Sequence, residues 1–283
     1  MSYRIRDLAG MEDMQECERI QKEVWGFCNL DVVPAGLVSV MGNYGAISAG
    51  AFVGDRMAGF VSGFPAFDRG GPFHHSHMLA VRREYRGAGL GIALKWAQAD
   101  RVRERGIRRI NWTFDPLQAP NANLNINRLG CLAWVYRINV YGHSQSPLHG
   151  GIPTDRLEPE WLLDTERVRR ARRNEGRLPP GIPELPRVNR VRARNDGLPE
   201  STEPVVPGAA APPPEVLLFI PPRIREILKA NVGLAVDWRL KTRAAFTALF
   251  ERGYQVTAFH RDGERTAYRL TRPRVRRGGA AAG

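Results

Sequence analysis

A glycine-rich turn between an apolar run and an amphipathic segment is the feature that most constrains this chain. The apolar run 78–81 predicts a buried strand, and the spacing of apolar residues over 90–102 predicts a helix. The basic turn between them contains Gly87 and Gly89, and Gly91 follows at the start of the helix. Glycines let a backbone approach a ligand closely, and a turn of this kind directs several N–H groups to one point. The sequence therefore predicts a strand–turn–helix unit that binds an anion, typically a phosphate.

Two well-known phosphate loops do not match this turn. The dinucleotide fingerprint G-x-G-x-x-G requires a third glycine where Ile92 stands. A P-loop ends in Gly-Lys followed by Ser or Thr, whereas Gly91 is followed by Ile92 and Ala93. The pattern that matches is R-x-x-G-x-G, formed by Arg86, Gly89 and Gly91.

Together with residues 79–81, this pattern resembles the acyl-CoA-binding motif of the GNAT acyltransferase superfamily. Within that superfamily, residues 76–79, 112–117 and 151–156 are similar to one group of predicted acetyltransferases. The resemblance covers residues 3–163 and implies an α+β fold, with a mixed, mostly antiparallel central sheet flanked by helices.

The resemblance also implies a co-substrate, acetyl-CoA or another acyl-CoA, and no metal. The amides of the loop would hold the coenzyme A pyrophosphate, and the backbone of the preceding strand would pair with the pantetheine arm. The implied cofactor residues are Leu79, Ala80, Val81, Arg86, Gly87, Ala88, Gly89, Leu90, Gly91 and Asn121.

Residue periodicity predicts the elements of the rest of the chain. They are a strand at 3–7, a helix at 11–24, a hairpin at 46–64, a strand at 73–81, a helix at 90–104, a strand at 107–114, a helix at 121–129 and strands at 133–141 and 156–163. Residues 1–165 are predicted to form the acyl-CoA-binding domain, and residues 166–214 an Arg/Pro/Gly/Ala-rich linker that is partly disordered.

Regular patterns resume in a small C-terminal module over 215–273, followed by a flexible tail over 274–283. The module reads β-α-α-β-β, with strands at 216–220, 254–260 and 266–270 and helices at 222–229 and 238–250. Two arrangements remain open at this stage. The module either completes the sheet of the first domain or joins the sheet of a partner in a homodimer.

Composition narrows the class of protein. The chain has 283 residues and a net charge of +13, carried mostly by arginine. Arginine together with abundant Ala, Gly and Pro is typical of a GC-rich genome, so this charge is weak evidence for a nucleic-acid partner, and none is predicted. The 3 cysteines are far apart in sequence, which excludes a disulfide framework and a cysteine metal cluster. Without an apolar leader or a run of about 18 apolar residues, we expect a cytoplasmic protein with no membrane partner.

Acyl transfer to an amine requires a base, because an ammonium group has no free electron pair. His75 is the first candidate, because it lies six residues before Val81, where some GNAT members place a catalytic glutamate, and histidine titrates near neutral pH. His77 is a second catalytic candidate, because it is predicted to share the face of His75 on the strand. Asp115, at the end of the next strand, is a competing base or an amine-binding carboxylate. The structural alternatives are hydrogen-bonded strand histidines and a turn-forming aspartate.

The general acid and the acceptor are less defined. Many GNAT proteins carry a tyrosine four residues before a helix-ending glycine, and this chain has Ile126 there. Tyr136 and Tyr141 are near in sequence, and a thiolate also leaves without a dedicated acid. Arg156 is predicted to bind an acceptor carboxylate, because its planar fork suits one; an internal pair with Asp155 is the alternative.

These residues predict an N-acyltransferase that acts on a small amine or amino-acid-like acceptor by direct transfer of an acetyl or succinyl group. The alternatives are a protein lysine acetyltransferase and a non-enzymatic acyl-CoA-binding or regulatory module. A nucleic-acid binder is disfavoured, because no aromatic residues interrupt the basic run 168–173.

Overall fold

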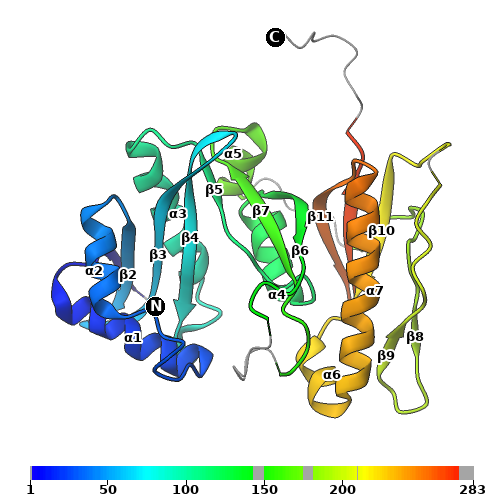
Figure 1. Cartoon of the computed structure of the whole chain (residues 1–283), viewed down its shortest axis with the longest axis horizontal. Helices are drawn as coiled ribbons and strands as arrows, with labels where there is room; N and C mark the ends of the chain where they lie inside the picture. The colour runs from blue at the N-terminus through cyan, green and yellow to red at the C-terminus, as the bar shows by residue number, and fades with distance from the viewer. Residues whose placement is uncertain (1, 143–149, 175–180, 209, 274–283) are drawn as a thin grey trace, which may run out of the picture.

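One mixed sheet of 10 strands runs through the chain (Figure 1). The computed structural model describes residues 2–142, 150–174, 181–208 and 210–273. The strands of the large sheet lie in the order β1-β2-β3-β4-β5-β7-β6-β11-β12-β10, and β8 and β9 form a separate hairpin. The strands are β1 Arg4–Asp7, β2 Ile47–Val53, β3 Arg56–Asp68, β4 Gly71–Val81, β5 Arg109–Asn111, β6 Leu132–Arg137, β7 Arg156–Leu162, β8 Val191–Ala193, β9 Pro199–Ser201, β10 Glu215–Ile220, β11 Gln255–Asp262 and β12 Arg265–Thr271. The helices are α1 Gly10–Trp25, α2 Ala35–Asn43, α3 Leu90–Glu104, α4 Ala119–Ala122, α5 Glu166–Arg172, α6 Ile224–Ala230 and α7 Val232–Glu251, with a π-helix at Asn123–Arg128 and a 3-10 turn at Arg83–Tyr85.

The predicted α+β class is confirmed. Every neighbouring pair in the large sheet is antiparallel except β4–β5, which is parallel. Buried residues follow one another almost without interruption along β2 and β3, and successive side chains point to opposite faces, so both faces of the sheet are covered. Phe60 packs with Ile20 of α1 on one face, and the next residue, Val61, packs with Leu94 of α3 on the other.

The parallel pair β4–β5 is short. It joins His74 to Ile110 and His75 to Asn111, and no further ladder pair between the two strands follows among the described residues. The predicted strand 107–114 is therefore reduced to three ladder residues plus an isolated bridge from Phe114 to β7. Because β4 continues to Val81, its edge beyond His75 faces no strand on the β5 side.

A bulge in β4 changes the direction of its side chains. Ser62 pairs with Met78 but Gly63 pairs with Ser76, so His77 is the extra residue. Ser76 therefore contacts Lys95 of α3, while Met78 joins the core under α1 on the opposite face. This extra residue could not be read from the strand pattern.

The C-terminal module has the predicted β-α-α-β-β order and extends the first sheet, because Val256 of β11 pairs with Ala133 of β6. The two parts share one apolar core, in which Ile126 and Leu157 pack with Trp238 and Phe246 of α7. In this chain, the module thus completes the sheet of the first domain, one of the two arrangements left open above.

Hydrogen bonds also join the C-terminal module to the first part of the chain. The Asn127 side chain of the π-helix donates to the Phe259 carbonyl and accepts from its N–H, at 2.7 and 3.1 Å. The buried Asp155 carboxylate accepts two hydrogen bonds from Arg243 of α7, at 2.7 and 2.8 Å. These contacts fix α7 and β11 against β6, β7 and the π-helix.

The segment predicted as a linker contains regular structure. Thr165 caps α5, whose Val168 is buried, and Val188 is buried in the shared core. The division of the chain at residues 165 and 215 into separate domains stays a prediction. None of the helices in the described part of the chain is long and apolar enough to cross a membrane.

Candidate active site

The glycine-rich turn has the backbone geometry of an anion site. Gly87 and Gly89 have φ angles of +84° and +82°, in the left-handed region that favours glycine, and α3 begins at Leu90. Among the described residues, the amides of Gly87 through Gly91 donate no hydrogen bond. These unpaired donors at a helix N-terminus can bind a phosphate group.

A cavity of about 510 Å³ lies beside this turn. Of the predicted cofactor residues, its lining includes Leu79, Val81, Arg86, Gly87, Gly89, Leu90, Gly91 and Asn121. Arg86 and Arg128 line it and no carboxylate does, so the cavity suits a polyanionic molecule. Ala80 does not line it, because its side chain is buried under α1 on the other face of β4. Ala88 does not line it either.

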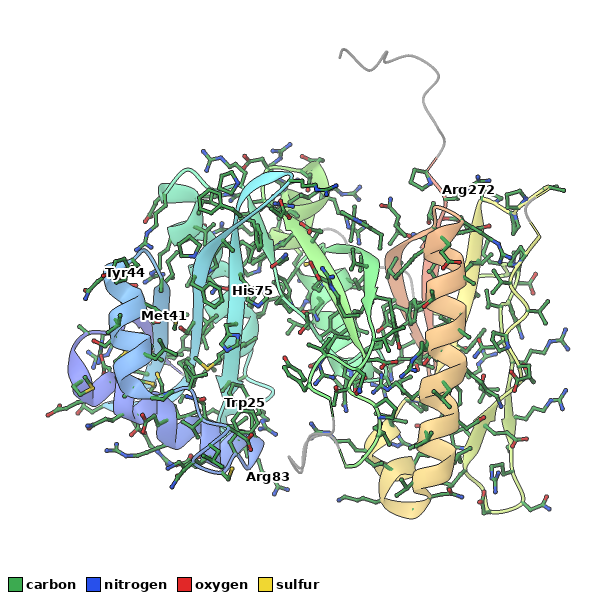
Figure 2. All side chains as sticks on the ribbon, viewed as in Figure 1. Trp25, Met41, Tyr44, His75, Arg83 and Arg272 are labelled. Atoms are coloured by element: carbon green, nitrogen blue, oxygen red, sulfur yellow. The ribbon has the colours of Figure 1, made fainter. Side chains whose placement is uncertain are left out.

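His75 lies on β4 in the middle of the sheet (Figure 2). Its Nδ1 atom is 2.9 Å from Oδ1 of Asn111, and Nδ2 of Asn111 donates to Glu158 at 3.2 Å. A carboxylate only accepts, so this contact orients the Asn111 amide and makes its Oδ1 the acceptor for His75. His75 Nδ1 therefore carries the proton, and the neutral ring presents the Nε2 electron pair. That tautomer is the form of histidine that can accept a proton from an amine.

The other two histidines of β4 differ from His75. The ring of His77 is 6.1 Å from that of His75, and both rings are next to Phe64, so the two share a face as predicted. His74 faces α3 and contacts Gln98 at 3.2 Å. Burial and the nearby charge of Lys95 lower the pKa of His74 to about 3, so it stays neutral at physiological pH.

Sequence reasoning missed Glu158 and Glu160 of β7. Glu160 pairs with Asn111 in the sheet, so the two side chains share the face of His75. The Glu160 side chain is 9% exposed, and its Oε2 atom has no hydrogen-bond partner among the described residues. Burial raises the pKa of Glu160 to about 7. The signal was present in the predicted strand 156–163, where Glu158 and Glu160 alternate with the apolar residues Leu157, Pro159 and Trp161.

Asp115 and Arg156, both predicted substrate residues, line one second, smaller cavity. Asp115 is already engaged: its Oδ1 accepts from the Leu117 amide at 2.9 Å and from Arg239 of α7 at 2.7 Å. Arg156 stacks over Tyr141 at 5.1 Å and donates to the Asp155 carbonyl oxygen. The structure therefore brings Asp115 and Arg156 together in this cavity. His75, Asn111 and Glu160, which are aligned in a row across β4, β5 and β7, do not line it.

Ile126 stands at the position where many GNAT proteins carry the tyrosine that acts as general acid. Ile126 is fully buried in the shared core. Tyr136 stacks on Phe246 and donates its hydroxyl proton to Asp155 at 2.9 Å, and burial raises its pKa. A buried tyrosine with a raised pKa is a poor proton donor to a thiolate.

Among the described residues, no group of three or more His, Cys, Asp and Glu side chains is arranged to hold a metal ion. The 3 cysteines are free thiols.

Residues 11–125 match the family model described as the acetyltransferase (GNAT) family. A GNAT-family acetyltransferase from Desulfovibrio desulfuricans is 18% identical over 57% of this chain and 99% of that chain, with a TM-score of 0.46. The ribosomal-protein-S18-alanine N-acetyltransferase from Escherichia coli is 17% identical over 58% and 96% of the two chains, with a TM-score of 0.47. An aminoglycoside acetyltransferase from an uncultured soil metagenomic sample is 17% identical over 40% and 78%, with a TM-score of 0.37. No curated protein sequence matches the chain. The match of the family model, on a strand–turn–helix unit with this loop geometry, identifies residues 11–125 as an acetyltransferase domain of the GNAT family.

Proposed function

We propose that the protein transfers an acetyl or succinyl group from acyl-CoA directly to a small amine or amino-acid-like acceptor. One observation carries the donor half of this proposal, namely the cavity of about 510 Å³ beside the unpaired amides of Gly87–Gly91. In the proposed complex, those amides hold the pyrophosphate of coenzyme A. The pantetheine arm follows the edge of β4 beyond His75, where no strand competes for its backbone groups.

In the proposed reaction, the acceptor lies on the face of the sheet that holds His75 and Asn111. His75 Nε2 takes a proton from the acceptor ammonium, and the neutral amine attacks the thioester carbon. A backbone N–H at the edge of β4 stabilises the oxygen as negative charge develops on it. The tetrahedral intermediate then collapses and the C–S bond breaks. Coenzyme A leaves as the thiolate and becomes the thiol by taking up the proton that the new amide nitrogen releases. Asp115 is the less favoured base, because its carboxylate is engaged by Arg239.

One observation favours a second candidate, a module that binds acyl-CoA without transferring the acyl group. The family tyrosine position is the buried Ile126, and Tyr136 is held by Asp155. A non-catalytic module binds acetyl-CoA but releases no thiol with any amine, whereas the favoured function requires thiol release. A protein lysine acetyltransferase releases thiol only with protein or peptide acceptors.

Gly91→Asp tests the donor site. Gly91 lacks the positive φ of Gly87 and Gly89, and a Cβ there meets only Val81 Cγ2, at 3.9 Å. An aspartate in the first turn of a helix is compatible with folding, but its charge repels a pyrophosphate. We expect the affinity for acetyl-CoA to fall by about 100-fold, or about 2.7 kcal/mol, in calorimetric titration.

Gly91→Asn is the matched control, because it has nearly the same shape without the charge. We expect it to retain most of the affinity and to unfold at the same temperature as Gly91→Asp. Equal affinity of the aspartate variant and the wild type would remove the donor site from this turn.

A further inference from the structure

The second cavity lies between the C-terminal module and the part of the chain that precedes it. Asp115 and Gln118 line it from the β5–α4 connection and Arg156 from β7, while α6 contributes Arg225 and α7 contributes Arg239. Three guanidinium groups and one carboxylate thus surround it, so its net charge is positive. The space inside is about 20 Å³, enough for a group the size of one or two water molecules.

Arg239 is the most informative residue of this cavity. Only 1% of its side chain is exposed, and one nitrogen, Nη2, donates to Asp115. Its Nε and Nη1 atoms are buried and have no hydrogen-bond partner among the described residues. The Tyr136 hydroxyl donates its own proton to Asp155, and its oxygen, which lies near the guanidinium, can accept from only part of these donors. Buried donors without acceptors are costly, so an acceptor from outside the described chain is favoured here.

Arg225 complements Arg239 at the same cavity. It is exposed and, within the described ranges, makes no hydrogen bond or ion pair. Guanidinium groups bind planar carboxylates through paired N–H donors. The small space fits a carboxylate group better than a bulky phosphoryl group.

We propose that this cavity binds a carboxylate group of the substrate, a proposal that rests on the acyl transfer proposed above. Gln118, which precedes α4, lines this cavity, and Pro120 in α4 lines the larger one, so the two cavities are lined by residues two positions apart. The carboxylate belongs either to the acceptor or to the far end of a dicarboxylic acyl chain. In both cases the C-terminal module supplies two of the three arginines, so the site is incomplete without it.

The test compares substrates that differ only in a carboxylate. With acetyl-CoA as donor, each of the common amino acids is compared with its decarboxylated amine; with the best amine as acceptor, succinyl-CoA is compared with acetyl-CoA. We expect the carboxylate-bearing member to be preferred in one of these arms, which identifies the source of the carboxylate. Arg225→Gln should raise KM for that member about tenfold, or about 1.4 kcal/mol, and leave KM for its counterpart unchanged.

Arg223→Gln is the matched control, because Arg223 precedes α6, is exposed and pairs with Glu226 and Glu264 outside the cavity. It should leave every KM unchanged. The proposal is overturned if Arg225→Gln changes neither member of a pair, or changes both equally.

Calorimetry separates this proposal from the proposed acyl transfer. The wild type is titrated with acetyl-CoA and succinyl-CoA, and the protein saturated with coenzyme A is titrated with the amino acids and amines. If no thiol is released with any pair but a carboxylate-bearing ligand binds tighter than its counterpart and loses that advantage in Arg225→Gln, the transfer reaction fails and the carboxylate site stands. If no carboxylate-bearing ligand has an advantage in binding or KM, the carboxylate site fails.

Discussion

At the scale of residues, the neighbours of His75 decide what its ring can do. The contact chain from His75 to Asn111 to Glu158 holds the proton on Nδ1, and Arg137 donates to Glu158 at 2.8 Å. A histidine in another tautomer would present a donor where the reaction needs an acceptor. The same strand carries His74, which contacts Gln98 on the other face of the sheet, and Gln98 in turn accepts a hydrogen bond from Lys95.

We therefore expect His75→Asn to lower kcat by about 100-fold or more, within the usual range for loss of a general base. The acidic limb of the pH profile of kcat/KM should disappear with it, while KM for acyl-CoA stays the same. His77→Asn is the matched control, and we expect it to remain within about twofold of the wild type. A pH profile unaltered by His75→Asn would transfer the role of base to another group.

Lys95 is expected to make the stability of the protein depend on pH. It is buried, its ammonium contacts Ser76 and Gln98 at 2.8 and 3.1 Å, and it lies 3.6 Å from the centre of the Trp112 ring. Burial lowers its pKa to about 7, from the value of about 10.5 that is usual for lysine. Between these values the unfolded chain binds more protons than the folded one, so this lysine makes the free energy of unfolding rise with pH.

Lys95→Met removes that component. From urea unfolding at pH 7 and pH 9.5, we expect the free energy of unfolding of the wild type to gain about 2 to 3 kcal/mol relative to the variant as the pH rises. An identical pH dependence of the two proteins would show that Lys95 titrates normally.

At the scale of elements, the short β4–β5 ladder and the β4 bulge organise the candidate site. The parallel pair ends at His75 and Asn111, which leaves the edge of β4 free from there to the glycine-rich turn. The bulge at His77 puts Met78 and Ala80 into the core under α1, while Leu79 and Val81 line the larger cavity. One strand thus presents the candidate base on one face and the walls of the donor cavity on the other.

The sequence predicted most elements at this scale, but it did not predict the π-helix. The helix expected at 121–129 begins at Ala119 and changes to a π-helix at Asn123, where the Leu129 amide bonds to the carbonyl of Leu124. Asn127 on this turn holds the backbone of Phe259, a partner 132 positions away. Helical periodicity does not register such a distant contact, so a π turn was not predictable.

At the scale of the whole molecule, the two parts of the chain complete each other. The shared core takes Leu117, Ile126 and Leu157 from the part of the chain before the module, and Trp238 and Phe246 from the module. Removal of the module would expose these apolar residues of the first part and leave β6 as a free edge.

We therefore expect a chain that ends at residue 165 to aggregate or to unfold without a cooperative transition. A chain that ends at residue 273 is the control and should unfold cooperatively, as followed by circular dichroism with size-exclusion chromatography. Cooperative unfolding of the 1–165 chain at the same temperature as the control would instead support an independent first domain.

The sequence by itself determined the strand–turn–helix unit and its three glycines, because the geometry of a turn depends on the few residues within it. It also determined the element order of both parts through local periodicity. Only the tertiary structure decided that Asn111 and Glu158 orient His75, that Glu160 lies in the same row and that Arg239 reaches Asp115. These residues come from strands and helices far apart in the chain, and the pairing register that aligns them depends on packing of the whole sheet.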